Sequence, residues 1–300
     1  MRNELADSLI RRFNKKKFIF LTGDLGFNAL ENLERKIKKY FINVGIAEQN
    51  MVGISAGLVK NNIETWIYSI APFLYARSFE QIRNDICFHN LPVKIIGTGG
   101  GYGYGVMGPS HHSIDDYGVL LGMPNMKIYI PVFSSDVPVI INKMSITKNP
   151  SYIRLSRDEA SDDYKKIPYS KCRKLTFGKG KIILSIGSIA GYYMKNFNNL
   201  DFRKRPNLWV ISELPLSDKD IPKELIEEIN KSKEVYVIEE HIKNGGLLSH
   251  LINNTSLLSS LRINSIKHFY AKDHIYNTYG SQNFLRKKTQ LDFESILKTL

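Results

Sequence analysis

The stretch "FINVGIAEQNMVGISAGL", residues 41–58, joins a short apolar run to a helix-like segment of small residues, with Glu48 at the junction. We expect a buried strand to end here and a buried helix to begin. A carboxylate is costly at such a point, because burial disfavours its charged form. No charged residue close by in the sequence offsets that cost.

Two interpretations of Glu48 are open from this pattern. Acidic residues are favoured in the first turn of a helix by the helix dipole, which would make Glu48 structural. The small residues that follow, Gly53, Ser55, Ala56 and Gly57, predict instead that the helix packs closely against another backbone. A charge at the start of a tightly packed helix needs a partner, and we expect that partner to be a ligand.

Composition narrows the class of protein. The 300 residues are 43% hydrophobic and 24% charged, which is typical of a globular chain with two domains. Cys87 and Cys172 lie far apart, so they predict neither a disulfide framework nor a metal motif, and they fit a reducing cytoplasm. Residues 1–17 show apolar residues at helical spacing between charges, which favours a surface helix over a signal peptide. No apolar run approaches the roughly 20 residues of a membrane helix.

The net charge is +13, which raises the question of nucleic-acid binding. The lysines are spread along the chain, and we find no helix-turn-helix, zinc or RNA-binding signature. We therefore expect no nucleic-acid partner. An acidic protein partner or a lysine-rich proteome would explain the charge.

Apolar runs alternate with helix-like segments along the whole chain. This order predicts two α/β domains, each a doubly wound and mostly parallel sheet. We expect residues 1–160 to form one domain, the polar stretch 161–178 to be a linker, and residues 179–300 to form the second. The expected strands are 17–22, 40–44, 64–70, 93–98, 126–132, 151–156, 181–187, 207–212, 234–240 and 265–270. The expected helices of the first domain lie near 48–60, 73–88, 113–121 and 134–145.

Chemistry in such sheets is carried by loops at the carboxyl ends of the strands. Glu48 falls there, and so do "TGDLGFN" (22–28) and "GTGGGYGYGVMGPSHH" (97–112). Adjacent histidines point in different directions, so His111 and His112 do not predict a two-histidine metal site. One of them facing a pocket as an acid, base or hydrogen-bond donor is the better hypothesis. For "VIEEHIKNGGLLSHL" (237–251) we favour a structural role, because nothing nearby supplies a nucleophile or metal set.

These segments together resemble a known family. The ordered motifs "NVGIAEQNMVGISAGL", "YSIAPFLYARSFEQIRNDI", "GYGVMGPSHHSIDD", "PNMKIYIPVFSSD", "YIRLSRDE" and "VIEEHIKNGGLLSHL" resemble the carboxyl-terminal half of transketolase. They are also similar to 1-deoxyxylulose-5-phosphate synthase and to the beta subunit of the decarboxylating component of pyruvate dehydrogenase. The resemblance runs from about Phe18 to the end of the sequence and covers both expected domains.

The resemblance implies that the first domain binds the aminopyrimidine ring of thiamine diphosphate. Glu48 matches the family's catalytic glutamate, which bonds a ring nitrogen and sets the tautomer of the cofactor. By the same resemblance Phe73, Ile70 and Ile46 contact the cofactor, and Asp24 lies near it and near a subunit contact.

The resemblance also implies two roles toward the substrate. His111 matches the histidine that stabilises a developing alkoxide or relays a proton. Arg157 of "RLSR" matches the arginine that grips a distal phosphate. The second domain resembles one that binds no cofactor.

One half of the family's cofactor site has no counterpart in this sequence. Other members hold the diphosphate and Mg2+ through a GDG run followed by asparagines, whereas "GDL" at 23–25 lacks the second glycine. We therefore expect no metal ligand on this chain. The resemblance implies a split transketolase whose partner, the N-terminal diphosphate-binding subunit, holds most of the Mg2+ site, and it implies self-association into a heterotetramer.

The predicted function is transfer of a two-carbon ketol or acyl-anion unit between sugar-type carbonyl compounds. A decarboxylating acyl-anion synthase is the alternative within the enzyme class, and a non-catalytic interaction subunit is the alternative outside it. Two departures from the family concern the substrate. Met107 stands where an acid recognises a substrate hydroxyl, and Gly99 stands where a histidine binds the sugar phosphate. A modified sugar, such as a deoxy or nucleotide-linked one, is therefore predicted.

Overall fold

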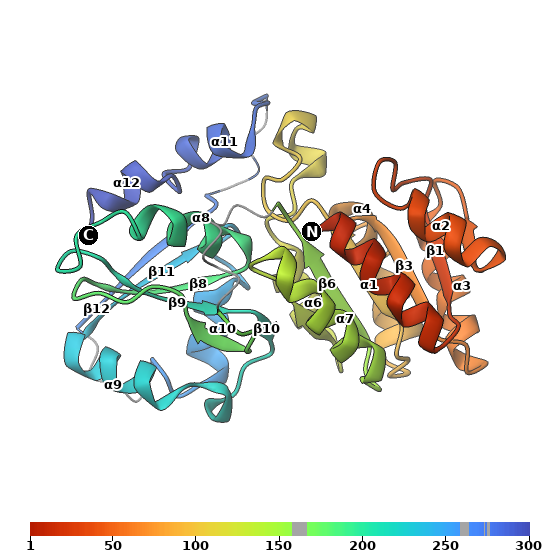
Figure 1. Ribbon diagram of the computed structural model, residues 1–300, viewed down its shortest axis with the longest axis horizontal. Helices are drawn as coiled ribbons and strands as arrows, with labels where there is room; N and C mark the ends of the chain where they lie inside the picture. The colour runs from red at the N-terminus through yellow and green to blue at the C-terminus, as the bar shows by residue number, and fades with distance from the viewer. Residues whose placement is uncertain (158–166, 259–263, 273, 275–276) are drawn as a thin grey trace.

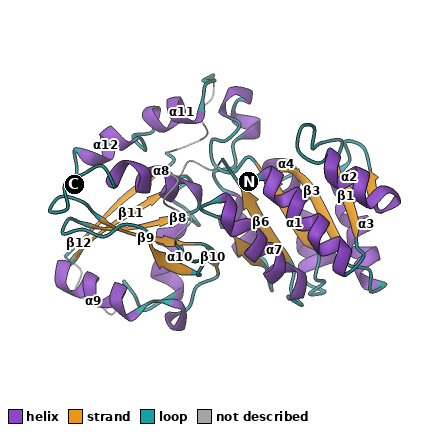
Figure 2. Cartoon of the chain, in the orientation of Figure 1, coloured by secondary structure: helices purple, strands orange, loops and turns teal. Residues whose placement is uncertain are grey.

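Two mostly parallel sheets lie side by side, each covered by helices on both faces (Figure 1, Figure 2). The computed structural model describes residues 1–157, 167–258, 264–272, 274 and 277–300. The predicted α/β class, with two doubly wound sheets, is confirmed.

The first sheet has seven strands in the order β10-β5-β6-β4-β3-β1-β2. Its strands are β1 (Ile19–Thr22), β2 (Phe41–Asn43), β3 (Thr65–Ile70), β4 (Lys94–Thr98), β5 (Lys127–Tyr129), β6 (Ser151–Leu155) and β10 (Glu213–Leu214). The central strands β4 and β6 are buried along their whole length, because helices cover both faces. The prediction of a buried strand before Glu48 is wrong, since β2 lies at the sheet edge and is partly exposed.

Amphipathic helices cover the two faces of this sheet. Helices α1 (Arg2–Lys15), α2 (Glu31–Ile37) and α7 (Val137–Ile146) pack on one face through an apolar cluster that includes Phe20 and Trp66. Helices α3 (Glu48–Lys60) and α6 (Asp116–Leu121) pack on the other face (Figure 1).

The segment predicted as one helix near 73–88 is broken. It forms α4 (Ala71–Tyr75), α5 (Phe79–Gln81) and a π-helix, η2 (Ile82–Cys87). The break falls around Arg77, whose side chain turns toward Glu48. Three short 3-10 turns, η3 (Gly105–Met107), η4 (Pro109–His111) and η5 (Ser134–Asp136), complete the loops of this half, together with η1 (Lys38–Tyr40).

The second sheet has five strands in the order β12-β11-β8-β9-β7. They are β7 (Cys172–Lys174), β8 (Ile182–Ile186), β9 (Asn207–Ile211), β11 (Glu234–Glu239) and β12 (Ser265–Tyr270). Helices α8 (Ser188–Phe197), α11 (Gln282–Lys288) and α12 (Phe293–Leu297) lie on one side, and α9 (Lys223–Ser232) and α10 (Leu247–Asn254) on the other (Figure 1). The turn η7 (Asp218–Asp220) precedes α9.

The predicted linker 161–178 is partly structured. Residues 161–166 lie outside the described residues, but Cys172–Lys174 form β7, which pairs antiparallel with β9 in the second sheet. After β9 the chain returns to the first sheet, where β10 pairs antiparallel with β5. The division at 160 and 178 stays a prediction.

The small-residue face of α3 is open. A side chain added at Gly53 or Gly57 would meet nothing within 4 Å. The prediction that these glycines pack on another backbone is therefore wrong within this chain. Ser55 and Ala56, on the other side of the helix, are the buried members of the group.

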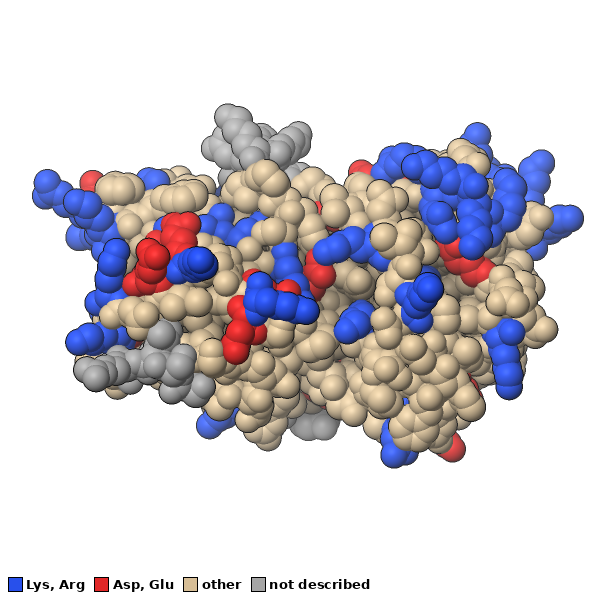
Figure 3. All heavy atoms as spheres, turned by 90° about the horizontal axis from the view of Figure 1, so that it is seen from below, with Lys and Arg blue, Asp and Glu red and all other residues tan. Residues whose placement is uncertain are grey.

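Basic side chains are distributed over both halves of the molecule. On the face shown in Figure 3 they are more abundant than acidic ones and gather most densely at the end formed by the first sheet. Their presence on both halves fits the spread of lysines along the sequence, whereas their gathering at one end arises from the fold.

Buried ionic groups hold the two sheets together at the carboxyl end of β11. Glu240 accepts hydrogen bonds from the Tyr102 amide at 2.9 Å and from Gln282, and it pairs with the fully buried Arg286 at 2.7 Å. Glu239 accepts from the Tyr117 hydroxyl at 2.6 Å. These contacts agree with the structural role predicted for the 237–251 motif.

We expect Glu240→Gln to lower the free energy of unfolding by about 3–5 kcal/mol, because it leaves the Arg286 charge buried without its carboxylate. Urea unfolding of the full chain measures this loss. The control is Glu224→Gln, which removes an exposed partner of Lys174 and should cost less than about 1 kcal/mol. Equal shifts for the two variants would contradict a dominant role of the buried pair.

Candidate active site at the carboxyl edge of the first sheet

Glu48 is the first residue of α3, and its side chain is buried although β2 before it is not. Only 1% of Glu48 is exposed. Its carboxylate accepts a hydrogen bond from the Ser69 hydroxyl at 3.1 Å and pairs with the Arg77 guanidinium at 2.6 Å. Arg77 thus supplies a positive charge to this carboxylate from 29 residues further along the chain, and the expectation of a ligand partner stays a prediction.

Phe73 and His111 extend this group. The Arg77 guanidinium lies 4.5 Å from the centre of the Phe73 ring, and the His111 ring meets Phe73 edge-on at 5.0 Å. The predicted residues Glu48, Phe73 and His111 thus come together, although they are drawn from three different segments. Parallel strands that end at one edge of a sheet bring such segments together.

His111 is placed to exchange a proton at one ring nitrogen. Its Nδ1 lies 3.0 Å from the Ser110 hydroxyl, and among the described residues no hydrogen bond is made to Nε2. Burial lowers the pKa of His111 below its usual value of 6.5, so the ring is mostly neutral at pH 7.

His112 points elsewhere, as expected for adjacent histidines. Its ring packs edge-on against Tyr102 at 5.1 Å and stacks near His274 at 6.3 Å. Burial is the main cause that lowers the pKa of His112 to about 4. Within the described part of the chain, no three or more His, Cys, Asp or Glu side chains are grouped to hold a metal ion.

The remaining predicted contacts lie at the rim. Ile70 ends β3, just before α4, and Ile46 is 77% exposed in the loop that leads into α3. Asp24 is exposed in a left-handed backbone conformation, and its carboxylate accepts a hydrogen bond from the Asn43 amide at 2.9 Å. Asp24 is thus tied to the loop after β2.

Arg157 lines a hollow of about 560 Å³ next to the glycine-rich loop, residues 97–112. Arg2, Tyr104, Ser156 and Gln282 are also part of its wall. Two guanidinium groups and no carboxylate line this hollow among the described residues, so it is suited to an anion such as a phosphate.

Gly99 is required by the shape of the glycine-rich loop. Its φ of +85° is unfavourable for other residues, and a Cβ there would lie 2.2 Å from the Tyr104 ring. Tyr104 therefore fills the space in which a side chain at position 99 would stand. Met107, the last residue of η3, is 55% exposed.

Sequence reasoning missed two arginines. Arg77 lies four residues after Phe73 in an otherwise apolar segment, which is the signal that could have marked it. The sequence gives no such signal for Arg2, because Arg2 begins a helix whose charged residues resemble those of any solvent-exposed helix face. Only the packing of α1 beside the glycine-rich loop brings Arg2 to the hollow that Arg157 lines.

A known domain family matches the half of the chain that carries these residues. The sequence profile of "Transketolase, pyrimidine binding domain" matches residues 7–162. The chain belongs to the transketolase family. The predicted resemblance is confirmed.

Similar members of the transketolase family extend over both halves of the chain. It is 32% identical over 263 residues to one subunit of apulose-4-phosphate transketolase from Actinobacillus succinogenes, covering 85% of this chain and 82% of that protein. The protein of the same name from Phocaeicola vulgatus is 29% identical, with coverages of 85% and 83%.

A solved structure described as "Split gene transketolase, inactive beta4 tetramer" superimposes with a TM-score of 0.78 at 26% identity. It covers 99% of this chain and 95% of that one. The prediction of a transketolase-type pyrimidine-binding subunit is thereby confirmed. None of the described helices combines the length and apolar character needed to cross a bilayer.

We expect Gly99→Ala to destabilise the chain by about 1–3 kcal/mol, because it combines an unfavourable φ with overlap on the Tyr104 ring. Gly122→Ala is the control, since its φ of −73° suits any residue and its added methyl meets only the Val119 carbonyl oxygen at 3.5 Å, so it should stabilise by about 0.4–1 kcal/mol. Denaturant unfolding of both variants measures the difference. A neutral Gly99→Ala would mean that the loop readily moves Tyr104 aside.

Proposed function

We propose that this chain is the pyrimidine-binding subunit of a thiamine-diphosphate-dependent transketolase that transfers a two-carbon ketol unit between sugar-type carbonyl compounds. The observation that carries the proposal is the convergence of Glu48, Phe73 and His111 at the carboxyl edge of the first sheet. Activity then requires a partner subunit that supplies the diphosphate-binding half of the site and most of the Mg2+ ligands.

The residues at this edge fit an aminopyrimidine ring. Such a ring requires a carboxylate that hydrogen-bonds a ring nitrogen and an aromatic side chain that packs on the ring, and Glu48 and Phe73, linked through Arg77, can provide them. Ile70, Ile46 and Asp24 would complete the contacts from the rim. When bound, thiamine diphosphate supplies the carbon nucleophile that protein side chains lack.

This chain's own residues orient the reaction and handle protons. Glu48 would present its carboxylate to a ring nitrogen of the cofactor, and the contacts with Ser69 and Arg77 hold that carboxylate in place. Neutral His111 can donate or accept a proton at Nε2, beside the aromatic face of Phe73. Arg157, together with Arg2, would fix the phosphate of a sugar substrate and so orient its carbonyl end.

The open face of α3 supports assembly. Gly53 and Gly57 expose backbone, and Ile54, Phe79 and Phe88 expose apolar side chains near this part of the first domain. Surfaces of small and apolar residues favour close contact between subunits. We propose that residues 1–160 provide the self-association surface of a heterotetramer and that residues 179–300 form a separate C-terminal domain.

A modified sugar is the proposed substrate. Two similar proteins are named for apulose 4-phosphate, which favours an unusual sugar phosphate over a common pentose phosphate for this chain as well. Tyr104 fills the space beside Gly99, and Met107 offers a thioether where a hydroxyl-binding acid is expected. Both features change the polar contacts available to the sugar.

Ketol transfer is preferred over a decarboxylating reaction because these similar proteins are transketolase subunits that match most of this chain's length. The non-catalytic alternative is disfavoured by the retention of Glu48 and His111 in one group, since an interaction subunit has no need of either.

We expect Glu48→Gln to lower the turnover of the reconstituted complex about a hundredfold or more, because an amide cannot hold the same proton. Steady-state kinetics with a saturating partner subunit measure the loss, and size-exclusion chromatography checks assembly. Glu34→Gln on the exposed side of α2 is the matched control and should leave turnover unchanged. Near-normal turnover of Glu48→Gln in an intact complex would reduce Glu48 to a helix-terminal charge.

A substrate panel tests the identity of the sugar. We expect the reconstituted complex to have a higher kcat/KM for apulose 4-phosphate or for deoxy or nucleotide-linked sugars than for xylulose 5-phosphate and ribose 5-phosphate, by at least about tenfold. Met107→Asp should shift the preference toward the pentose phosphates, with Ile146→Asp at the exposed end of α7 as the control. Better turnover of both pentose phosphates than of every modified sugar would reject this substrate class.

A further inference from the structure

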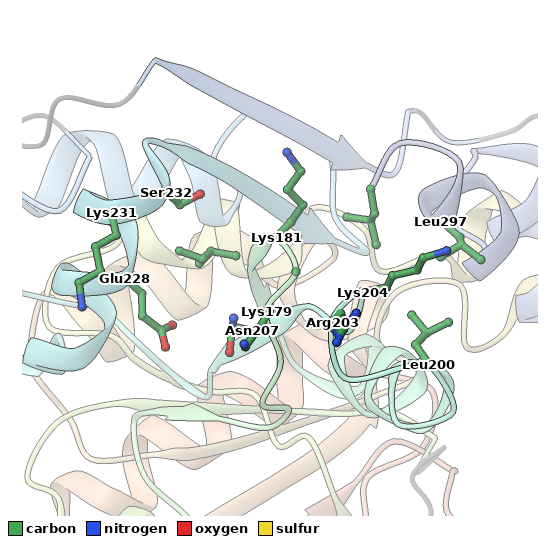
Figure 4. Close-up of a pocket in the computed structure, with 13 residues that line it drawn as sticks. Lys179, Lys181, Leu200, Arg203, Lys204, Asn207, Glu228, Lys231, Ser232 and Leu297 are labelled. Atoms are coloured by element: carbon green, nitrogen blue, oxygen red, sulfur yellow. The ribbon is translucent and has the colours of Figure 1, made fainter.

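A hollow of about 990 Å³ lies at the amino ends of the second sheet, at the opposite end of the molecule from α3 (Figure 1, Figure 4). The carboxyl ends of the same strands face the first sheet (Figure 1). The hollow is therefore separate from Glu48 and from the cavity that Arg157 lines, and the proposed function makes no use of it.

Cationic side chains reach this hollow from three segments (Figure 4). Lys179 and Lys181 lie just before β8, Arg203 and Lys204 lie in the loop between α8 and β9, and Lys231 lies near the end of α9. Glu228 is the acidic side chain that the described residues contribute to the lining.

The charges in the lining are unevenly neutralised. Glu228 is already engaged, because it pairs with Lys174 and accepts a hydrogen bond from the Trp209 indole at 2.8 Å. Lys181 pairs with Glu234 outside the hollow.

Among the ion pairs of the described residues, none involves the other four cations, Lys179, Arg203, Lys204 and Lys231. Four like charges around one hollow repel one another, and an anion between them would relieve that repulsion.

The backbone holds the two cationic loops together. The Asn207 side chain bonds Gly178 twice, accepting from its amide at 3.2 Å and donating to its carbonyl at 3.0 Å. The Lys179 amide donates to the Phe202 carbonyl at 3.0 Å, and the Gly180 amide donates to the Arg205 carbonyl at 2.9 Å. These bonds place the loop that carries Lys179 directly beside the loop that carries Lys204.

Only glycine fits at two points of this contact. A Cβ on Gly178 would lie 1.9 Å from the Arg205 carbonyl oxygen, and one on Gly180 would lie 2.5 Å from that of Lys204. The close approach of the two loops thus depends on both glycines. The cations are therefore carried by a defined backbone arrangement.

The hollow also has an apolar side. Ile182, Leu200, Leu297 and Leu300 belong to its lining, and Figure 4 shows Leu200 and Leu297 on the same side as Lys204. Its volume is in the range of sites for organic ligands, which run from about 300 to 1,000 Å³. An inorganic ion would leave most of this space and the leucines without a partner.

We propose that this hollow binds a phosphorylated organic molecule of nucleotide size, with its phosphates on Lys179, Lys204 and the neighbouring cations and its apolar part against Leu200 and Leu297. The site lies in the domain whose family resemblance implies no cofactor. Occupancy would neutralise the repelling cations and so stabilise the second domain.

Calorimetric titration of the full chain with ADP, and separately with inorganic phosphate, tests the proposal. We expect ADP to bind, Lys179→Ala/Lys204→Ala to weaken it at least tenfold, and inorganic phosphate to bind at least tenfold more weakly than ADP. The control variant Lys36→Ala/Lys39→Ala removes the same charge from exposed positions of α2 and η1 and should bind ADP as the unaltered chain does. Circular dichroism confirms that each variant is folded.

A second variant separates this hollow from the other anion site. Arg2→Ala/Arg157→Ala should leave ADP binding unchanged if the nucleotide occupies the hollow of the second domain. The proposal is overturned if only Arg2→Ala/Arg157→Ala loses ADP binding, or if the two double-lysine variants weaken ADP binding equally. It is also overturned if the unaltered chain binds phosphate as tightly as ADP, or does not bind ADP.

Discussion

Parallel pairing of β1, β3, β4 and β6 is the constraint on which the rest of the first domain depends. Strands that run in one direction end at one edge, so every loop that follows them emerges at the same place. The loop into α3, the turn into α4 and the glycine-rich loop therefore meet without being close in sequence. Glu48, Phe73 and His111 are brought to one edge by strand direction and are linked through Arg77, which pairs with Glu48 and lies over the Phe73 ring.

Buried charge decides how these loops and the second domain are held. Glu48 pairs with Arg77, Glu240 pairs with Arg286, and the buried Arg154 lies 3.2 Å from Asp116. Each pair joins segments that are distant in sequence, and Arg154 also donates a hydrogen bond to the Glu240 carbonyl of the other half at 3.1 Å. Because an unpaired charge in the interior is costly, each partner restricts where the other segment can lie. The site and the contact between the two sheets thus rest on the same principle.

Two features at the molecular surface, the open face of α3 and the cationic hollow, differ in how they are formed. The α3 face with Gly53 and Gly57 has no partner within the described chain, whereas the cationic hollow near Lys179 is formed by close backbone contacts within one domain. The first fits contact with another subunit, since the glycines leave the backbone accessible over a broad face. The second fits a small ligand, since its walls come from three segments around one volume.

The sequence by itself determined the α/β class, nearly every strand, the start of α3 at Glu48 and the family, because apolar alternation and short motifs are local properties. Glu48 and His111 could be singled out for the same reason, since each follows a predicted strand. The tertiary structure alone decided that Arg77 partners Glu48, that Arg2 joins Arg157, that Tyr104 fills the space beside Gly99 and that β10 crosses into the first sheet. These are contacts between distant segments, and they depend on how the sheets and helices pack, which the spacing of residues along the chain does not encode.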